Sequence, residues 1–214
     1  MTTASYLFTD RRHGDLSIDD PDAALGPRRS AIHRAPWTWL RQVHGAQVVT
    51  VTAPGEHAGA EADAAVTAVP GAVLAVQTAD CAPVVFLGAG VVGVAHAGWR
   101  GLAEGVLGAT ASAMAALGGP PTRAILGPCI RARCYEFGDR DLAVVADRLG
   151  PSVRSSTGWG TPALDLSAGV AAACAALGID LDDDGTCTAC SPQHWSFRAR
   201  GESGRQAGVA WLAP

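Results

Sequence analysis

The stretch from Pro70 to Gly101 reads PGAVLAVQTADCAPVVFLGAGVVGVAHAGWRG and carries most of the information about the fold. Its apolar, β-branched runs, separated by Gly or Asp residues, are Val73 to Gln77, Pro83 to Leu87 and Val91 to Ala95. Short apolar runs bounded by turn residues are typical of buried strands. The stretch therefore predicts three adjacent strands, with Cys81 between the first two and His96 closing the third.

The hydrophobic period changes after this stretch. From Arg100 onward, apolar residues recur at helical spacing as far as Leu117, and two glycines and two prolines then end the pattern. The motif HAGWRG is therefore a predicted strand-to-helix turn. The first turn of a helix presents free backbone N–H groups, so a phosphate site with Arg100 as its side-chain partner is one interpretation. An ion pair between Arg100 and Glu104 explains the same arginine equally well.

The rest of the chain mixes helices, strands and loops. Amphipathic spacing predicts helices at Asp139 to Leu149 and Leu166 to Leu177, and an apolar run predicts a final strand at Ala207 to Leu212. The stretch Gly14 to Ala35 is rich in Asp, Pro and Arg without periodicity, which predicts a surface loop. Asp180 to Gly185 is predicted to be a short acidic turn. The strand order does not follow from these patterns.

Length and composition suit one soluble domain. The chain has 214 residues, 48% of them hydrophobic, which allows a substantial core in a single domain spanning residues 1–214. It lacks an apolar run of bilayer length and a leader with basic and apolar regions, so we expect a cytoplasmic protein without a membrane partner. The net charge of −4 argues against a nucleic-acid partner. The oligomeric state stays open.

Three short motifs carry residues that bind metals. They are RQVHG at 41–45, TADC at 78–81 and HAGWRG at 96–101, and they contain His44, Cys81 and His96. Imidazole and thiolate are ligands that zinc prefers, and three protein ligands leave a position for water or substrate. The spacing alone leaves other interpretations open, because each residue also suits a structural role as a strand cap, a small buried thiol or a core histidine.

The other cysteines allow a second interpretation. Cys187 and Cys190 form a CxxC pair, and together with Cys129 and Cys134 they are sufficient for a structural zinc site. A chain without a secretory signal is expected to keep its cysteines reduced or use them as ligands, rather than form disulfides. Four thiols without a metal are the preferred interpretation here.

Several motifs in one order identify the chain as similar to a known family. The quoted segments are RQVHG at 41–45, EADAAVT at 61–67, PGAVLAVQTADCAPVVF at 70–86, GVAHAGWRG at 93–101, LGPCI with CYEFG at 126–138, and SFRARGESGRQAG at 196–208. They resemble the YfiH/laccase-domain family, also called the purine nucleoside phosphorylase family related to human laccase domain-containing protein 1. The resemblance runs from about Phe8 to Leu212.

The resemblance implies a fold, a metal and an activity. The implied fold is α+β, a single domain with a mixed β-sheet flanked by helices. The implied metal is a zinc ion bound by His44, Cys81 and His96. The implied activities are phosphorolysis of adenosine, inosine, guanosine or methylthioadenosine, which is a transferase reaction, and deamination of adenosine, which is a hydrolase reaction. Zinc lowers the pKa of bound water towards about 7, which suits the deamination. Purine nucleosides and phosphate are the expected partners.

Further residues are assigned to substrate and to proton transfer. Arginine donors would offset the charge of phosphate, and the candidates are Arg11, Arg41 and Arg100. The N-terminal segment FTDRRHG departs from the family pattern, and Arg11 is its closest counterpart of the family arginine. Gln42 is assigned to the substrate site because it belongs to the QVHG motif. The candidates for proton transfer are Asp80, Glu61 and Asp63.

Three alternatives share these residues. A copper-dependent polyphenol oxidase is possible because divalent affinity rises towards copper, although laccase chemistry needs several coppers and the chain has six histidines. A non-catalytic zinc-binding protein would complete a closed site with His57 or His194. A cysteine hydrolase would use Cys81 with a histidine base and would stay active without metal.

Overall fold

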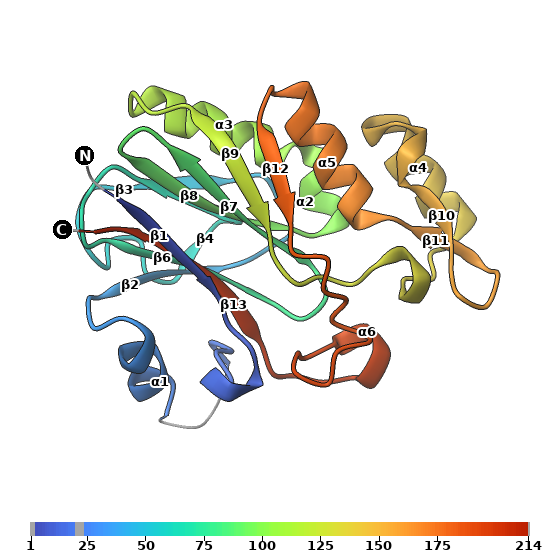
Figure 1. Cartoon of the computed structure of the whole chain (residues 1–214), viewed down its shortest axis with the longest axis horizontal. Coiled ribbons are helices and arrows are strands. Elements are labelled where there is room, and N and C mark those ends of the chain that lie inside the picture. The colour runs from blue at the N-terminus through green and yellow to red at the C-terminus, as the bar shows by residue number, and fades with distance from the viewer. Residues whose placement is uncertain (1–2, 20–23, 214) are drawn as a thin grey trace.

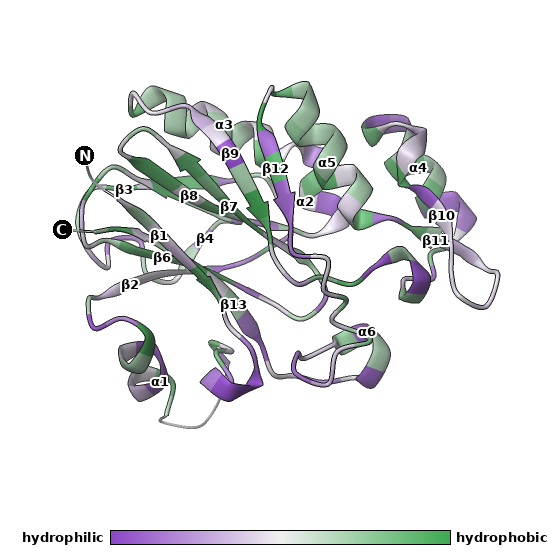
Figure 2. Cartoon of the chain, viewed as in Figure 1, coloured by the Kyte–Doolittle hydropathy of each residue, from purple (hydrophilic) through white to green (hydrophobic). Residues whose placement is uncertain are grey.

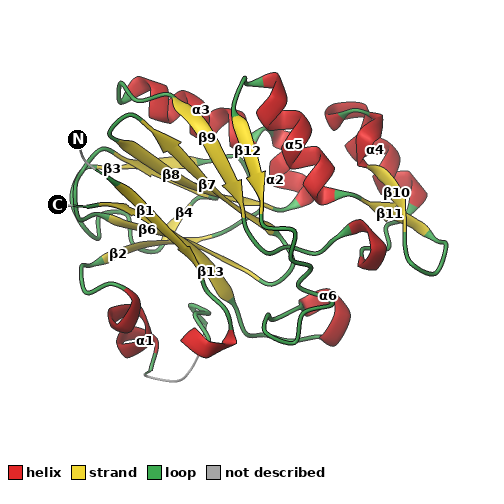
Figure 3. Cartoon of the chain, viewed as in Figure 1, coloured by secondary structure: helices red, strands yellow, loops and turns green. Residues whose placement is uncertain are grey.

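Two β-sheets pack face to face at the centre of the molecule, and helices cover their outer faces (Figures 1 and 3). The computed structural model describes residues 3–19 and 24–213. The five-stranded sheet has the order β1 (Ala4–Phe8), β13 (Gln206–Leu212), β6 (Val73–Thr78), β2 (Trp37–Arg41), β4 (Ala60–Glu61). The six-stranded sheet has the order β12 (Asp180–Asp183), β9 (Pro121–Leu126), β7 (Ala82–Gly88), β8 (Val91–Ala97), β5 (Ala64–Thr67), β3 (Val48–Val51).

Both sheets are mixed. In the five-stranded sheet β2 is parallel to β4 and β6, whereas β13 is antiparallel to β1 and β6. In the six-stranded sheet β7, β8 and β9 are antiparallel neighbours, and the outer strands β3 and β12 join in parallel. The expected α+β fold with mixed sheet and flanking helices is therefore confirmed, with the refinement that two large sheets form the centre of the described structure.

The helices are arranged around the sheets and a small hairpin. Their bounds are α1 (Leu25–Ile32), α2 (Trp99–Glu104), α3 (Val106–Ala116), α4 (Asp139–Leu149), α5 (Leu166–Ala176) and α6 (Phe197–Arg200). The hairpin of β10 (Arg154–Ser156) and β11 (Pro162–Leu164) lies beside α4, and α1 lies on the opposite side of the molecule from α3 and α5 (Figure 1). Among the described residues, no helix has both the length and the apolar character needed to cross a membrane.

Alternation along β7 shows how the sequence builds two hydrophobic layers. Val84 and Phe86 are fully buried on the face that packs against α2, α3 and α5. Val85 points to the opposite face and packs between the two sheets. Successive side chains of a strand alternate between faces, so a strand that is buried on both faces is apolar throughout. β7 and β8 are correspondingly among the most hydrophobic segments in Figure 2.

The structure corrects the predicted adjacency of the three central strands. β7 and β8 are neighbours, but β6 lies in the other sheet, between β13 and β2. A short apolar strand has the same sequence pattern in either sheet. The pattern indicates that the strand is buried, and it does not indicate which strand is its hydrogen-bonded neighbour. The turn at 79–81 is therefore a crossing between sheets.

Three local predictions were also wrong. The helix expected after HAGWRG is broken at Gly105, whose φ of 90° ends α2 and starts α3. The surface loop expected at Gly14 to Ala35 contains α1, whose Leu25 and Ile32 pack on the five-stranded sheet, while residues 20–23 lie outside the described part. The acidic turn expected at Asp180 to Gly185 begins with an edge strand, β12, because β9 offers it a parallel partner. In contrast, α4, α5 and β13 are confirmed.

Candidate metal centre

The candidate metal centre lies where the chain passes from one sheet to the other. Residues 42–47 join β2 to β3, residues 62–63 join β4 to β5, and residues 79–81 join β6 to β7. Because β2, β4 and β6 are parallel, these connections leave the five-stranded sheet at the same end. Segments that are far apart in sequence thus meet at one edge of the molecule's core.

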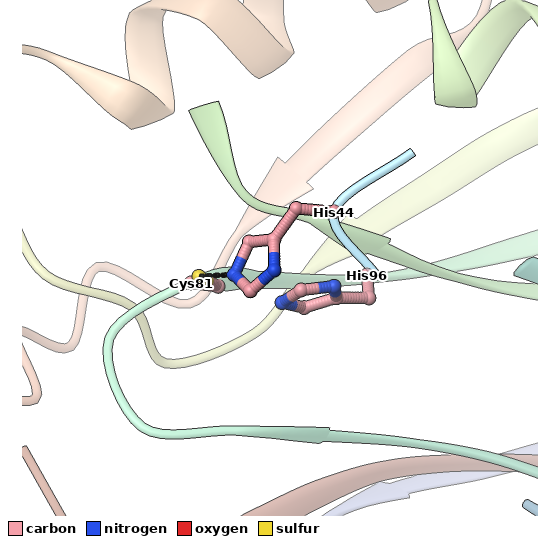
Figure 4. Close-up of side chains that lie close together, drawn as sticks. All are labelled: His44, Cys81 and His96. Carbon is pink, nitrogen blue, oxygen red and sulfur yellow. Dashed lines mark hydrogen bonds between the residues drawn. The ribbon is translucent and has the colours of Figure 1, made fainter. Parts of the chain in front are cut away.

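Each connection carries one polar residue of the centre. His44, Asp63 and Cys81 lie in the three connections, and His96 lies opposite Pro83 near the end of β8. The ligand atoms of His44, Cys81 and His96 all lie within 4.8 Å of one another. Figure 4 shows the two imidazoles and the thiol turned towards a common point. The structure therefore brings together the three residues that the motifs singled out.

The three ligands differ in exposure and setting. The Sγ atom of Cys81 lies 3.9 Å from Nε2 of His44, and the two imidazole rings meet edge to face with centroids 4.8 Å apart. His96 is 3% exposed, whereas His44 is exposed to solvent. Among residues 3–19 and 24–213, no fourth His, Cys, Asp or Glu joins this group, and neither His57 nor His194 does. The donor set has the three-ligand pattern of an open zinc site rather than a closed structural one.

The Asp63 carboxylate orients the candidate ligands His44 and His96 through hydrogen bonds. One carboxylate oxygen lies 2.8 Å from Nδ1 of His96, which leaves Nε2 of that ring for a metal. The same carboxylate accepts the backbone N–H groups of Val43, His44 and Gly45 at 2.8 to 3.2 Å. His44 has a φ of 62°, which is a left-handed conformation. The hydrogen bonds that these three N–H groups donate to Asp63 hold the backbone in that conformation. Metal-binding histidines are commonly oriented by such a carboxylate.

Ionisation of Cys81 and His96 is coupled. Burial opposes the thiolate, but the charge of His96 and hydrogen bonds to both histidines outweigh it and lower the pKa of Cys81 to about 6. Burial likewise opposes protonation of His96, but the Cys81 thiolate and Asp63 raise the pKa of His96 to about 9. The pocket thus stabilises a thiolate beside positive charge, which suits a divalent cation.

Close contacts at Gly98 and Gly101 explain why the HAGWRG motif has glycine at these two positions. A Cβ atom on Gly98 would lie 2.7 Å from Cδ2 of His44 and 3.2 Å from Sγ of Cys81, and one on Gly101 would lie 2.6 Å from the carbonyl oxygen of Gly45. Any side chain at either position would therefore displace the QVHG connection.

We expect Gly98→Ala to weaken metal binding at this centre about 10- to 100-fold, because it displaces two of the candidate ligands. The affinity is measured by competition for zinc with a chromophoric chelator. Gly108→Ala is the matched control, since a Cβ atom there meets nothing within 4 Å. Equal zinc affinity in the two variants would contradict this explanation of the motif.

Asp80 lies beside Cys81 but is turned towards the C-terminal segment. Its φ is 101°, and its carboxylate accepts hydrogen bonds from the Thr188 hydroxyl, the Ser196 hydroxyl and the Arg198 backbone N–H at 2.6 to 2.7 Å. These bonds use both carboxylate oxygens. The arrangement suits a residue that positions the Cys81 turn.

A cavity of about 400 Å³ opens over the three ligands. Gln42 is the assigned substrate residue that lines it, although both polar atoms of its amide also bond the backbone of Gln77 at 2.7 Å. The remaining lining residues were not singled out in the sequence, and those with polar or aromatic side chains are Ser17, Asp19, Gln77, Thr78, Phe197 and Arg205. Phe197 and Arg205 belong to the SFRARGESGRQAG segment, whose resemblance to the family was the signal that could have found them.

The three candidate arginines lie outside the lining of this cavity. Arg11 pairs with Glu202 and stacks on Trp195, and Arg41 is exposed at the end of β2. The Arg100 guanidinium lies 4.5 Å from the ring centroid of Trp99, and no ion pair with Glu104 occurs in the described structure. Glu61 is exposed in β4.

Comparisons with known proteins identify the family of the chain. A family model described as multi-copper polyphenol oxidoreductase laccase matches residues 14–213. A purine nucleoside phosphorylase of Streptomyces coelicolor is 41% identical, covering 98% of this chain and 96% of its own, and one of Streptomyces griseus is 43% identical, covering 98% and 95%. The crystal structure of a Neisseria meningitidis protein superposes with a TM-score of 0.86 at 29% identity, covering 100% of this chain and 99% of that one. The chain therefore belongs to the YfiH/laccase-domain family.

Proposed function

We propose that this chain is a zinc-dependent purine nucleoside phosphorylase that also deaminates adenosine. Adenosine, inosine, guanosine and methylthioadenosine are the proposed nucleosides, and phosphate is the second substrate. The proposal is supported by the names of relatives that match nearly the whole chain, and by the cavity over the His44, Cys81 and His96 donors. The observation that carries it is this three-donor cluster at the floor of a substrate-sized cavity.

The donor set fits zinc. Two imidazoles and one thiolate are borderline and soft ligands, and the cluster lacks a fourth donor among the described residues. A zinc ion bound there would supply Lewis-acid chemistry and a more acidic water. Asp63 holds Nδ1 of His96, so Nε2 of that ring is turned towards Cys81 and the chain presents its donors in a fixed orientation before the metal binds.

The cavity offers contacts for each part of a nucleoside and for phosphate. Phe197 is 63% exposed at the cavity wall, which makes its ring available for stacking on a purine. Thr78 presents a buried hydroxyl that has no hydrogen-bond partner within the described chain, so a bound ligand would satisfy it. Arg205 is the cationic residue of the lining and is assigned to phosphate.

In phosphorolysis, a phosphate oxygen bonds to C1′ of the ribose while the bond from C1′ to the purine nitrogen breaks. The electron pair leaves with the purine, which then takes up a proton. Arg205 would offset charge on the incoming phosphate, and stacking on Phe197 would hold the departing base in the cavity. In deamination, water replaces the amino group at C6 of adenosine, and ammonia leaves.

The test is chromatography of adenosine incubated with zinc-loaded protein, with and without phosphate. We expect adenine that depends on phosphate and inosine that does not, both lost in Cys81→Ala. Cys174→Ala is the control, because that thiol is buried in α5 and does not line the cavity. No product from adenosine, inosine or methylthioadenosine would overturn the proposal. Turnover that requires copper would favour the oxidase, and turnover that survives a chelator would favour a cysteine hydrolase.

A further inference from the structure

A second group of thiols lies apart from the first centre. The Sγ atoms of Cys134, Cys187 and Cys190 are within 4.8 Å of one another, and those of Cys134 and Cys190 are 3.3 Å apart. Cys134 ends the short 3₁₀ helix Ala132–Cys134, whereas the other two belong to a turn more than fifty residues later. Tertiary structure thus adds a third thiol to the CxxC pair.

The fourth cysteine considered from sequence does not join them. Cys129 is fully buried in the hydrophobic layer under α2, α3 and α5. Burial raises the pKa of its thiol to about 12, as expected for a small apolar core residue. From the sequence, four thiols without a metal were the preferred interpretation, and nothing in it separated Cys129 from the other three.

Backbone N–H groups surround Cys187. Two from its own turn donate to its carbonyl oxygen, and one from Arg131 donates to its sulfur. The backbone N–H groups of Cys190 and Ser191 bond the carbonyl oxygen of Cys187 at 3.2 and 2.9 Å, which closes the turn. The backbone N–H of Arg131 lies 3.4 Å from Sγ of Cys187 and donates to it. Hydrogen bonds of this kind favour a thiolate, the form that binds metals.

Two guanidinium groups lie near the turn, and each is paired with a carboxylate: Arg200 with Glu202 and Arg131 with Asp183. The Arg200 guanidinium donates to the carbonyl oxygens of Ala189 at 2.9 Å and Thr188 at 3.3 Å. Arg131 extends along the preceding segment, where it pairs with Asp183. A divalent ion with three thiolates carries a net charge of −1, and these paired guanidinium groups neither oppose that complex nor add net positive charge to it.

Cys134 also borders a second cavity, of about 600 Å³. Trp159, Glu136 and Arg198 line it, and Trp159 is held by a 2.9 Å hydrogen bond to the Glu136 carboxylate. The thiol group is thus reached from an open cavity on one side and enclosed by the CxxC turn on the other. A tetrahedral ion on these thiols would have its fourth position available to water from the cavity.

We propose that Cys134, Cys187 and Cys190 bind a second zinc ion, with water as the fourth ligand. Binding forms three zinc–sulfur bonds and releases the thiol protons to solvent, with no change of oxidation state. The ion would fix the CxxC turn to the segment that ends at Cys134. Thr188 lies within this turn and donates a 2.6 Å hydrogen bond to Asp80, so the second ion would also stabilise the turn that carries Cys81.

The test is zinc stoichiometry of fully reduced, zinc-loaded protein, measured by mass spectrometry of the metal. We expect two zinc ions per chain in the wild type, one in Cys81→Ala, one in Cys190→Ser and none in the double variant. Cys190 is exposed, so serine is tolerated there, and Cys174→Ala is the control that should keep two. Retention of one ion in Cys190→Ser also reports that its first centre is folded.

A second measurement leaves the proposed site unaltered. Cobalt-loaded Cys81→Ala should show sulfur-to-metal charge-transfer absorption from three thiolates, and further substitution of Cys134 by serine should reduce it. One zinc ion in the wild type, or a cobalt spectrum without thiolate ligands in Cys81→Ala, would overturn the proposal. A disulfide between Cys134 and Cys190 that persists in reductant and blocks zinc would overturn it as well.

Discussion

Asp63→Asn is expected to weaken zinc binding at the first centre by about 10- to 100-fold, the usual effect of removing a carboxylate that orients a metal-binding histidine. The carboxylate is fully buried and accepts Nδ1–H of His96 together with three backbone N–H groups of the QVHG connection. An asparagine would turn an N–H₂ group towards at least one of these donors. Both ligands that it holds, His44 and His96, should lose their fixed orientation.

The affinity is measured by competition for zinc against a chromophoric chelator. Asp165→Asn is the matched control, because Asp165 caps α5 through the backbone N–H of Ala168 and asparagine caps helices equally well. The control should bind zinc as the wild type does. An Asp63→Asn protein that folds and keeps wild-type zinc affinity would contradict the assigned role of this carboxylate.

The three candidate ligands of this centre could be selected from the sequence because their residue types are unusual in an apolar chain. His44, Cys81 and His96 lie in short motifs that stand out from an apolar, alanine-rich background, and the resemblance of those motifs to a family implied a metal. The geometry that unites them was not predictable, since it depends on three connections that cross between sheets at one end. Period-two patterns give a strand's burial and not its sheet.

Asp63 shows the same limit at a single residue. A carboxylate in EADA has the appearance of a surface or capping residue, and only the crossing from β4 to β5 buries it behind two histidines. Phe197 begins the short helix α6 and Arg205 directly precedes β13, in a C-terminal segment that otherwise consists of turns and loops. Contacts made by irregular segments leave no periodic signal, so the family-like motif was the available indication.

Asp80→Asn is expected to destabilise the protein by about 1.5–3 kcal/mol, since it removes a charged acceptor of buried hydrogen bonds. Asparagine tolerates the left-handed φ of 101° at this position, so the substitution tests the carboxylate and not the turn. The amide would face the backbone N–H of Arg198 with a donor of its own, or give up a bond from Thr188 or Ser196. Denaturant unfolding at neutral pH measures the change.

The same variant separates a positioning role from proton transfer, for which Asp80 was also a candidate. If Asp80 positions Cys81, Asp80→Asn lowers kcat and zinc affinity together, and the pH profile of the remaining activity keeps its shape. Thr188→Val removes one of the three donors without altering the carboxylate, and it should show a smaller change of the same kind. A wild-type zinc affinity combined with loss of one limb of the pH profile would instead assign the proton transfer to Asp80.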